Sequence, residues 1–269
     1  MTGTQALVRR PSPRLADGIV THIERSAVDE VLAVAQWHAY VDALQEAGWT
    51  PIEVPSAADC PDSAFIEDTM VVYKNVAVIA RPGADSRKPE TIEAEKVVEA
   101  LGYSINRIRP PGTLDGGDVL KVGDTIYVGR GERTNGEGLR QLRAILAPVG
   151  ATVIGVPLTK VLHLKSAVTA LPDGTIIGYP PLVDDISLFP RFLAVPEASG
   201  SHVVHLGRHR LLLSDDCPRT ARLLTDLGYD PVLVGISEFI KLEGCVTCLS
   251  VRLRGLHRPR SSRRLTSEG

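Results

Sequence analysis

The sequence predicts an α/β fold built from about five copies of one unit, which recur at roughly fifty-residue intervals. Each unit reads as two short apolar strands joined by a turn, then a polar loop and an amphipathic helix that ends at glycine. Such a unit cannot bury both its sheet and its helix alone. Copies arranged round an axis can do so, with the helices outside and the strand ends lining a central cavity. The spacing is equally compatible with an ordinary mixed sheet that has helices on one face.

Strand pairs are indicated by apolar runs that are interrupted at turn residues. We expect them at residues 69–79, 118–128, 168–177 and 203–213, and an N-terminal strand at 6–9 belongs to a fifth unit. The predicted turns are Lys74-Asn75, Gly123-Asp124, Asp173-Gly174 and Gly207-Arg208.

Helices are predicted where apolar residues share one face at intervals of three and four. We expect them before Gly48, at 89–101, at 138–149 and at 219–227, with a less regular one at 188–193. Glycine after the last apolar residue would supply the left-handed helix cap. These glycines are Gly48, Gly102, Gly150 and Gly228. The predicted buried face of the N-terminal helix carries Val28, Val31, Leu32, Ala35, Val41 and Leu44.

The composition is that of an ordinary globular protein. The chain has 269 residues, 43% of them hydrophobic and 23% charged, and its formal net charge is −2. This balance gives no argument for nucleic acid or a membrane surface as a partner. We expect one domain over residues 1–254, followed by a disordered tail at 255–269 that is rich in Arg, Ser and Pro.

Two observations bear on the location of the chain. No apolar stretch is long enough to cross a bilayer, and residues 1–13 lack the apolar core of a secretory signal. The four cysteines are expected to be reduced thiols, because a chain of this size does not need disulfides. The sequence therefore predicts a cytoplasmic setting. It does not set the oligomeric state, and a homodimer is compatible with it.

Two acidic segments interrupt apolar runs. In the run at 61–72, strand alternation would place Asp68 on the face of Ile66 and Met70 and Glu67 on the opposite face. A buried carboxylate needs a partner or a cation, whereas a strand end would simply leave both acids solvated. In the run at 113–120, Asp115 and Asp118 flank two glycines, and a tight turn would explain these without a function.

A histidine and a cysteine pair complete the chemically notable residues. His163 stands inside the apolar run 161–168, where it is either a hydrogen-bonded core residue or a catalyst. Cys245 and Cys248 have the C-x-x-C spacing of a redox pair or half a zinc site. The segment reads as a strand, which would separate the two Cα atoms by about 10 Å, while a disulfide needs less than about 7 Å. No further closely spaced zinc ligand is visible, so we expect a nucleophilic cysteine that works with a distant histidine.

Together these segments resemble the dimethylarginine dimethylaminohydrolases, a family of the pentein or guanidino-group-modifying superfamily. The resemblance covers almost the whole chain, and six short blocks occur in the family's order. They are residues 62–68, 81–84 with 86–87, 114–118, 133–135, 163–165 and 248–250. The resemblance implies a five-bladed α/β propeller, which agrees with the repeat.

The resemblance also implies the catalytic residues. Cys248 matches the nucleophile and His163 the general acid and base, while Asp68 and Asp115 match the carboxylates that hold the guanidinium nitrogens. Some bacterial members have glutamate at the position of Asp115. Cys245 stands where the family has glycine or an apolar residue, so we expect it to serve packing.

The remaining matched residues are implied to bind the amino-acid end of the substrate. Asp62 matches the group near the substrate amine, with the backbone carbonyls of Ile19 and Leu242 beside it. Arg87 and Arg133 match the pair that binds the carboxylate. Glu67 is expected near the site.

The implied activity is hydrolysis of a free methylated arginine, a small molecule, to citrulline and an alkylamine through a covalent thiouronium on Cys248. No cofactor and no metal is needed for this chemistry. Arginine deiminases and other arginine-hydrolysing penteins share the Cys–His–acid set, although arginine deiminases usually carry an additional helical insertion. A pentein propeller can also be a binding module without a nucleophile, as in the ribosome anti-association factors.

Overall fold

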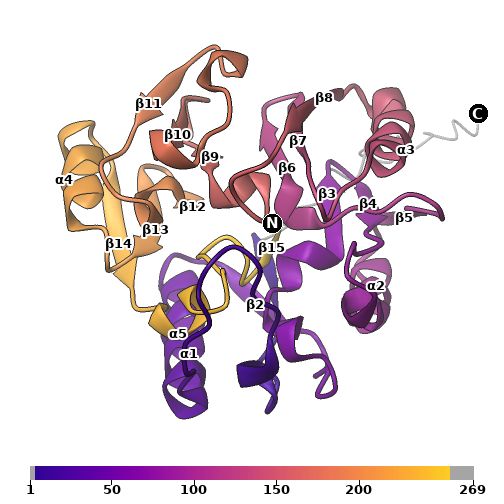
Figure 1. The fold of residues 1–269 in the computed structure, drawn as a ribbon, viewed down its shortest axis with the longest axis horizontal. Coiled ribbons are helices and arrows are strands. Elements are labelled where there is room, and N and C mark those ends of the chain that lie inside the picture. The colour runs from indigo at the N-terminus through magenta and orange to yellow at the C-terminus, as the bar shows by residue number, and fades with distance from the viewer. Residues whose placement is uncertain (1–3, 255–269) are drawn as a thin grey trace, which may run out of the picture.

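The computed structural model describes residues 4–254, which form five three-stranded sheets arranged as blades round a central axis, with the long helices on the outside (Figure 1). This confirms the predicted propeller over the mixed sheet. The predicted disordered tail at 255–269 lies outside the described residues. Within residues 4–254, no helix is long and apolar enough to cross a membrane.

Each of four blades is an antiparallel hairpin whose second strand pairs in parallel with a third. The first blade contains β3 (Met70–Tyr73), β4 (Val76–Ile79) and β5 (Ser104–Arg107), and the second β6 (Val119–Val122), β7 (Thr125–Arg130) and β8 (Thr152–Pro157). The third contains β9 (Val168–Ala170), β10 (Ile176–Gly178) and β11 (Phe192–Ala194), and the fourth β12 (Val204–Gly207), β13 (Arg210–Ser214) and β14 (Asp230–Val234).

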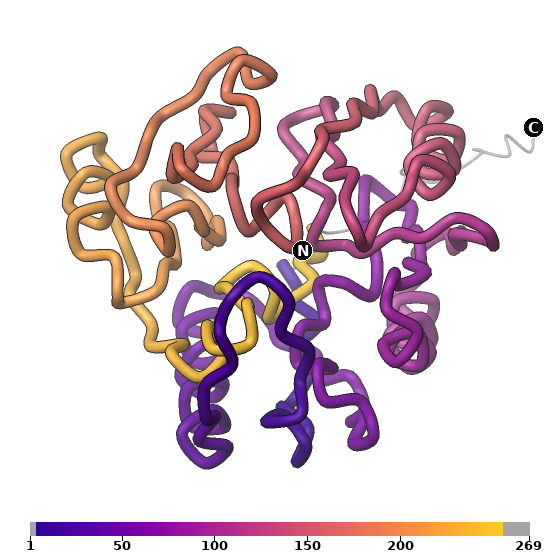
Figure 2. The backbone as a smooth tube through the Cα atoms, viewed as in Figure 1, coloured from indigo at the N-terminus to yellow at the C-terminus, as the bar shows by residue number. Residues whose placement is uncertain are grey.

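The fifth blade joins the two ends of the chain. β15 (Val251–Leu253) pairs antiparallel with β1 (Gln5–Val8), which pairs in parallel with β2 (Thr50–Glu53). Figure 2 shows the first and last segments of the described chain meeting in this blade. The ring is therefore closed by hydrogen bonds between residues far apart in the sequence.

The outer helices end where the glycines predict. These helices are α1 (Glu30–Glu46), α2 (Thr91–Ala100), α3 (Gly136–Leu146) and α4 (Pro218–Asp226), and a short α5 (Ser237–Ile240) follows in the last connection. The glycines after the four longer helices have φ between +85° and +91°, a left-handed conformation that costs glycine little. They are Gly48, Gly102, Gly150 and Gly228.

Two of the predictions for helices were wrong. Residues 188–193 do not form a helix, because Pro190 lies inside the segment. The third blade instead has short 3-10 turns before β11. In α1 the buried face carries Trp37 and Tyr40, with Ala33 and Leu44, whereas Val31 is 82% exposed. This helix packs against α5, β14 and β2, and its aromatic residues fill that contact.

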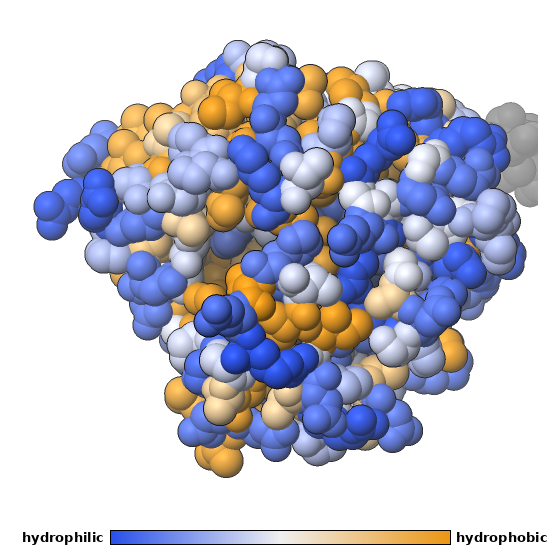
Figure 3. Space-filling model, viewed as in Figure 1, coloured by the Kyte–Doolittle hydropathy of each residue, from blue (hydrophilic) through white to orange (hydrophobic). Residues whose placement is uncertain are grey.

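The apolar core is divided among the interfaces between neighbouring blades. Leu7 and Val251 of the fifth blade, for example, pack with Met70 and Ile79 of the first. Similar clusters lie at the other four interfaces. Figure 3 shows a largely hydrophilic face, with apolar side chains gathered below its centre where the N-terminal loop crosses. Because the apolar clusters lie between the blades, the positions nearest the axis are available to polar side chains.

Candidate active site

The candidate residues occupy equivalent places in four blades, each just before the innermost strand. Asp68 lies in the 3-10 turn η3 (Ile66–Thr69) before β3, and Asp115 precedes η5 (Gly116–Asp118) and β6. His163 precedes η7 (Leu164–Ser166) and β9, and Cys248 lies in the turn before β15. The sequence predicted strands at Asp68 and Cys248, but both residues lie in turns. Because the blades radiate from one axis, these turns converge on it.

His163 is surrounded by carboxylates. Its Nε2 lies 3.0 Å from Asp115 Oδ2, and its Nδ1 lies 3.9 Å from Asp68 Oδ1. Burial opposes protonation of His163, but Asp68, Asp115 and Asp118 together raise its pKa to about 9. Burial raises the pKa of Asp118 to about 7, although it accepts hydrogen bonds from Thr134 Oγ1 and the backbone of residue 164. At neutral pH the ring is an imidazolium, ready to donate a proton.

Asp68 is held in one orientation from two sides. Arg87 Nη1 donates to its Oδ2 at 2.7 Å, and the amide of Gly117 donates to its Oδ1 at 2.8 Å. Burial disfavours the Asp68 charge, but His163 and Arg87 outweigh burial and lower its pKa to about 2. Arg87 is in turn bound through two nitrogens by buried Glu90. Asp68 is therefore a fixed anion facing the cavity.

The two glycines between Asp115 and Asp118 serve close approach. A Cβ at Gly117 would lie 2.6 Å from both Asp68 Oδ1 and His163 Nδ1, and a Cβ at Gly116 would lie 2.0 Å from the carbonyl oxygen of Glu67. Neither glycine has a positive φ. Their function is to let three turns from different blades meet at the axis.

Cys248 does not lie in a strand, which corrects the expected separation from Cys245. A tight turn, closed by the Cys248 amide on the Cys245 carbonyl at 3.0 Å, brings the two sulfurs to 3.2 Å. The hydrogen bond between the sulfurs raises the pKa of Cys248 and lowers that of Cys245, and burial adds to the rise at Cys248. Asp68 also raises the pKa of Cys248. The Cys248 thiol is therefore neutral at neutral pH.

The predicted groups for an amino acid lie in the same cavity. Asp62 accepts from the Ile19 amide at 3.0 Å, and Leu242 lies beside it. Arg133 is buried, and its Nη1 has no hydrogen-bond partner among residues 4–254. Arg87 lines the cavity too, but its guanidinium is already committed to Asp68 and Glu90. The two arginines predicted to bind the carboxylate are therefore not equivalent, because Arg133 has a free donor for an anion and Arg87 is already paired with carboxylates.

Glu67 is the exception among the predicted site residues. Its side chain faces away from Asp68 and pairs with Lys165 at 2.5 Å and Arg252 at 3.5 Å. It does not line the cavity that contains Cys248. The expectation that its side chain binds substrate is corrected: successive side chains of the η3 turn point to different ends of the axis, and only Asp68 points to this one.

The cavity is closed by an N-terminal loop. Its volume is about 20 Å³, too small for an arginine. The loop is fastened to Glu243, which accepts hydrogen bonds from the backbone amides of Thr21 and His22 at 2.7 and 2.8 Å.

The cluster also offers a geometry for a cation. One ligand atom each from Asp68, Asp115 and His163 lies within 4.8 Å of the others. These atoms are already engaged, because Arg87 neutralises Asp68 and the protonated His163 donates to Asp115. The charges favour an imidazolium between carboxylates over a metal ion.

Three buried residues of the site were not predicted: Asp118, Thr134 and Glu90. Asp118 orients the His163 turn through the Leu164 amide, and Thr134 donates to Asp118 while accepting from the Asp115 amide. The sequence could have indicated Asp118, since it is the second acidic residue flanking Gly116 and Gly117. Glu90 had no such signal, because an acid before a helix is usually solvated.

The chain is similar along its whole length to one curated relative. It is 65% identical over 257 residues to an N(G),N(G)-dimethylarginine dimethylaminohydrolase of Streptomyces coelicolor, a match that covers 96% of this chain and all of that protein. The chain belongs to the dimethylarginine dimethylaminohydrolase family. No protein-family model matches the chain.

Solved structures of this family superpose closely on the chain. A dimethylarginine dimethylaminohydrolase histidine-to-glycine variant in an adduct with S-methyl-L-thiocitrulline is 33% identical, with a TM-score of 0.88 over 93% of this chain and all of that one. A cysteine-to-serine variant of the Pseudomonas aeruginosa protein in complex with citrulline is 32% identical, with a TM-score of 0.88 over 94% of this chain and all of that one. The family's fold is therefore the fold described above.

Proposed function

We propose that the chain hydrolyses free methylated arginine, asymmetric dimethylarginine or monomethylarginine, to citrulline and an alkylamine. One observation carries the proposal: the cavity holds a thiol, an imidazolium bound to a carboxylate, and a second fixed carboxylate. These are Cys248, His163 with Asp115, and Asp68. Relatives of this chain form an adduct with S-methyl-L-thiocitrulline and a complex with citrulline.

Binding of the cation prepares the thiol. A guanidinium carbon is a poor electrophile, and fixing its nitrogens against Asp68, which lines the cavity, orients it and concentrates its charge. Asp115 acts behind this contact, because its two oxygens accept from the Gly83 amide and bind His163. The pKa of Cys248 is raised in the free protein, and a cationic substrate beside it lowers that pKa, so that the thiol proton is released to solvent because His163 already carries a proton. The reactive thiolate would then form only when the substrate is present.

Two steps then follow on the same carbon. The Cys248 thiolate attacks the guanidinium carbon, and His163 gives its proton to the departing amine as the C–N bond breaks, which leaves a thiouronium on sulfur. Neutral His163 next takes a proton from water, the hydroxide adds to the carbon, and collapse breaks the C–S bond to release citrulline. The raised pKa of His163 suits its first role, because the proton is present at the start.

The amino-acid end of the substrate would be held by charge. The unpartnered Nη1 of buried Arg133 supports binding of the α-carboxylate, with Arg87 beside it. Asp62, together with the carbonyls of Ile19 and Leu242, would bind the ammonium group. A free amino acid satisfies both ends, whereas agmatine leaves Arg133 uncompensated.

The experiment that tests this proposal is a citrulline assay across arginine, monomethylarginine, asymmetric dimethylarginine and agmatine. Methylated arginines should be turned over fastest. If unmethylated arginine were preferred, the chain would be an arginine-hydrolysing pentein, and the absence of turnover with binding retained would indicate a binding module.

We also propose that residues 1–254 act as one catalytic domain in the cytoplasm without nucleic-acid or membrane partners, with a homodimer compatible. Support for the location comes from the four cysteines, all of which are free thiols and buried. Size-exclusion chromatography with light scattering tests the oligomeric state.

A further inference from the structure

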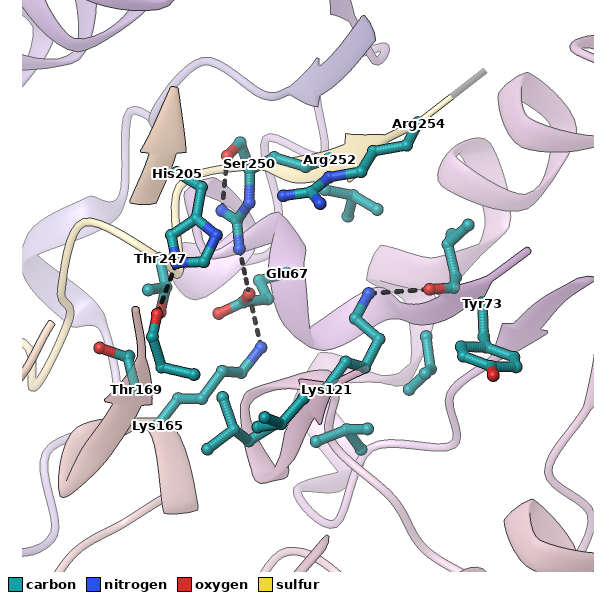
Figure 4. A pocket seen from close by; sticks show the side chains of 18 of the residues that line it. Glu67, Tyr73, Lys121, Lys165, Thr169, His205, Thr247, Ser250, Arg252 and Arg254 are labelled. Atoms are coloured by element: carbon teal, nitrogen blue, oxygen red, sulfur yellow. Dashed lines mark hydrogen bonds and ion pairs between the residues drawn. The ribbon is translucent and has the colours of Figure 1, made fainter. Parts of the chain in front are cut away.

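A second cavity lies among the innermost strands of the blades (Figure 4). Its volume is about 860 Å³, and its lining residues include parts of the innermost strand of every blade: β3, β6, β9, β12 and β15. It shares none of its lining residues with the cavity that contains Cys248. A volume of this size is within the range of small-molecule sites, about 300–1,000 Å³.

The charge of this axial cavity is strongly one-sided. Among the residues that line it, five are lysine or arginine and a single one, Glu67, carries a carboxylate. The five are Lys74, Lys121, Lys165, Arg252 and Arg254. Lys74 pairs with Asp124 at 3.6 Å, and Glu67 is shared by Lys165 and Arg252. Within residues 4–254, this leaves Lys121 and Arg254 without a carboxylate partner.

The cations are placed by secondary structure. Arg252 and Arg254 are two residues apart at β15, so they lie on one face of the strand, while the intervening Leu253 is buried in the core. Arg252 Nη1 donates to Ser250 Oγ at 3.3 Å, and Lys121 Nζ donates to the carbonyl of Val72 at 2.8 Å. Figure 4 shows these side chains extending into the cavity.

The pKa of Lys121 is lowered first by burial and then by the neighbouring positive charges. Although its side chain reaches the solvent inside the cavity, the surrounding protein and the neighbouring Lys165, Arg252 and Arg254 lower its pKa to about 7, against the opposing effect of Glu67. A bound anion would relieve this repulsion. A guanidinium substrate would increase it, so the axial cavity and the candidate active site select ligands of opposite charge.

We propose that the axial cavity binds a small polyanion of the phosphate class. Two guanidinium groups at one strand and two ammonium groups opposite them match a ligand with several phosphate oxygens, because arginine donates in pairs and lysine acts as a point charge. The proposal does not depend on the hydrolase activity, since the two cavities have no lining residue in common.

Calorimetric titration with pyrophosphate at physiological ionic strength tests it. We expect one saturable site per chain and proton uptake near pH 8, measured by repeating the titration in buffers of different ionisation enthalpy, as bound anion raises the pKa of Lys121. The double variant Lys121→Gln/Arg254→Gln should lose at least about tenfold in affinity. The control Lys96→Gln/Arg140→Gln removes two charges from the outer helices and should bind as the parent does.

Three results would overturn this proposal. They are the absence of saturable binding, an equal loss of affinity in both double variants, and tighter binding of citrate than of pyrophosphate, which would indicate a carboxylate site. Citrulline production by each variant confirms that it is folded.

An independent observation concerns the cysteine pair. Cys245 and Cys248 are buried, their sulfurs lie 3.2 Å apart, and the turn between them is closed by a backbone hydrogen bond. A turn of this kind holds its first and last Cα atoms within about 7 Å, the range that a disulfide spans. Cys245 is not needed by the hydrolysis steps above.

We infer that Cys245 is a resolving thiol that converts peroxide damage at Cys248 into a reversible disulfide, an inference that rests on Cys248 being the nucleophile. The Cys248 sulfur attacks a hydroperoxide oxygen while the thiol proton passes to the departing oxygen, the O–O bond breaks, and a sulfenic acid and water (or an alcohol) result. The Cys245 sulfur then displaces water from the sulfenic acid as the S–S bond forms. The pair has lost two electrons to the peroxide, and an external dithiol returns them.

Intact-mass and peptide mapping after hydrogen peroxide treatment tests the inference. The parent and the control Cys60→Ser should lose two hydrogen atoms in a Cys245–Cys248 disulfide, lose citrulline production, and regain it with dithiothreitol. Cys245→Ser should instead gain two or three oxygen atoms at Cys248 and stay inactive. Sulfinic or sulfonic acid at Cys248 of the parent would overturn the inference. A disulfide that leaves citrulline production intact would instead overturn the assignment of Cys248 as nucleophile.

Discussion

Replacing Gly117 by alanine tests whether close packing of the turns sets the catalytic geometry. The added methyl would lie 2.6 Å from both Asp68 Oδ1 and His163 Nδ1. Ordinary van der Waals contact begins at 3.4 Å, so either these two groups or the backbone at Gly117 must move by about 0.8 Å. Neither neighbour can rotate away cheaply, because Asp68 is bound by Arg87 and His163 by Asp115.

A displacement approaching 1 Å costs about a hundredfold in rate when it separates reacting groups. We therefore expect Gly117→Ala to lower kcat for asymmetric dimethylarginine by about that factor, with a smaller change in KM. Citrulline production over a range of substrate concentrations separates the two.

The matched control is Gly136→Ala at the start of α3, where the nearest atom to the added carbon is 3.9 Å away. This variant should have parental kinetics. If Gly117→Ala had parental kcat at an unchanged melting temperature, the turns would not set the geometry. If Gly117→Ala has a much lower melting temperature, its kcat is calculated per folded molecule before it is compared with that of the parent.

Three further predictions follow from the site. Cys248→Ser should abolish turnover while Cys245→Ser keeps most of it, and the reverse in a citrulline assay would exchange the two assignments. Since the pKa of His163 is raised from 6.5 to about 9, protonation of His163 stabilises the fold fully below pH 6.5, and this stabilisation is lost as the pH rises through 9. Chemical denaturation should therefore show the parent losing stability between these pH values relative to His163→Ala. The value of kcat/KM should also fall above pH 9. Losing one charge-assisted contact costs about 1.5–3 kcal/mol, so Arg133→Ala should lower kcat/KM for methylarginine by about ten- to a hundredfold, and should affect agmatine, already a poor substrate, very little. Equal turnover of agmatine and methylarginine by the parent would refute the carboxylate contact.

The repeat was predictable from the sequence because its signals are local. Hairpin turns such as Lys74-Asn75 and helix stops such as Gly102 depend on backbone preferences of one or two residues. Only the hairpin of the third blade could be predicted in this way, since prolines occupy the segment expected to form its helix. The exposed start of α1 has the apolar pattern of a buried helix.

The site was predictable as a set of residue types but not as a geometry. The resemblance named Cys248 and His163, and the structure brings both to one cavity. The cysteine segment was predicted to be a strand, which would hold the two sulfurs apart, but it forms a turn that brings them together. A run of β-branched residues does not by itself distinguish a strand from such a turn. Glu67 and Asp68 are adjacent in sequence yet face different cavities, a difference that only the turn before β3 determines.

Covalent labelling of the nucleophile tests the proposed function most directly. The protein is inactivated with chloroacetamidine, a small amidinium reagent, and the modified peptide is identified by mass spectrometry. We expect one adduct, on Cys248, formed in step with the loss of citrulline production and prevented by excess methylarginine. An adduct mainly on Cys245, or full activity in protein labelled at Cys248, would contradict the proposed mechanism.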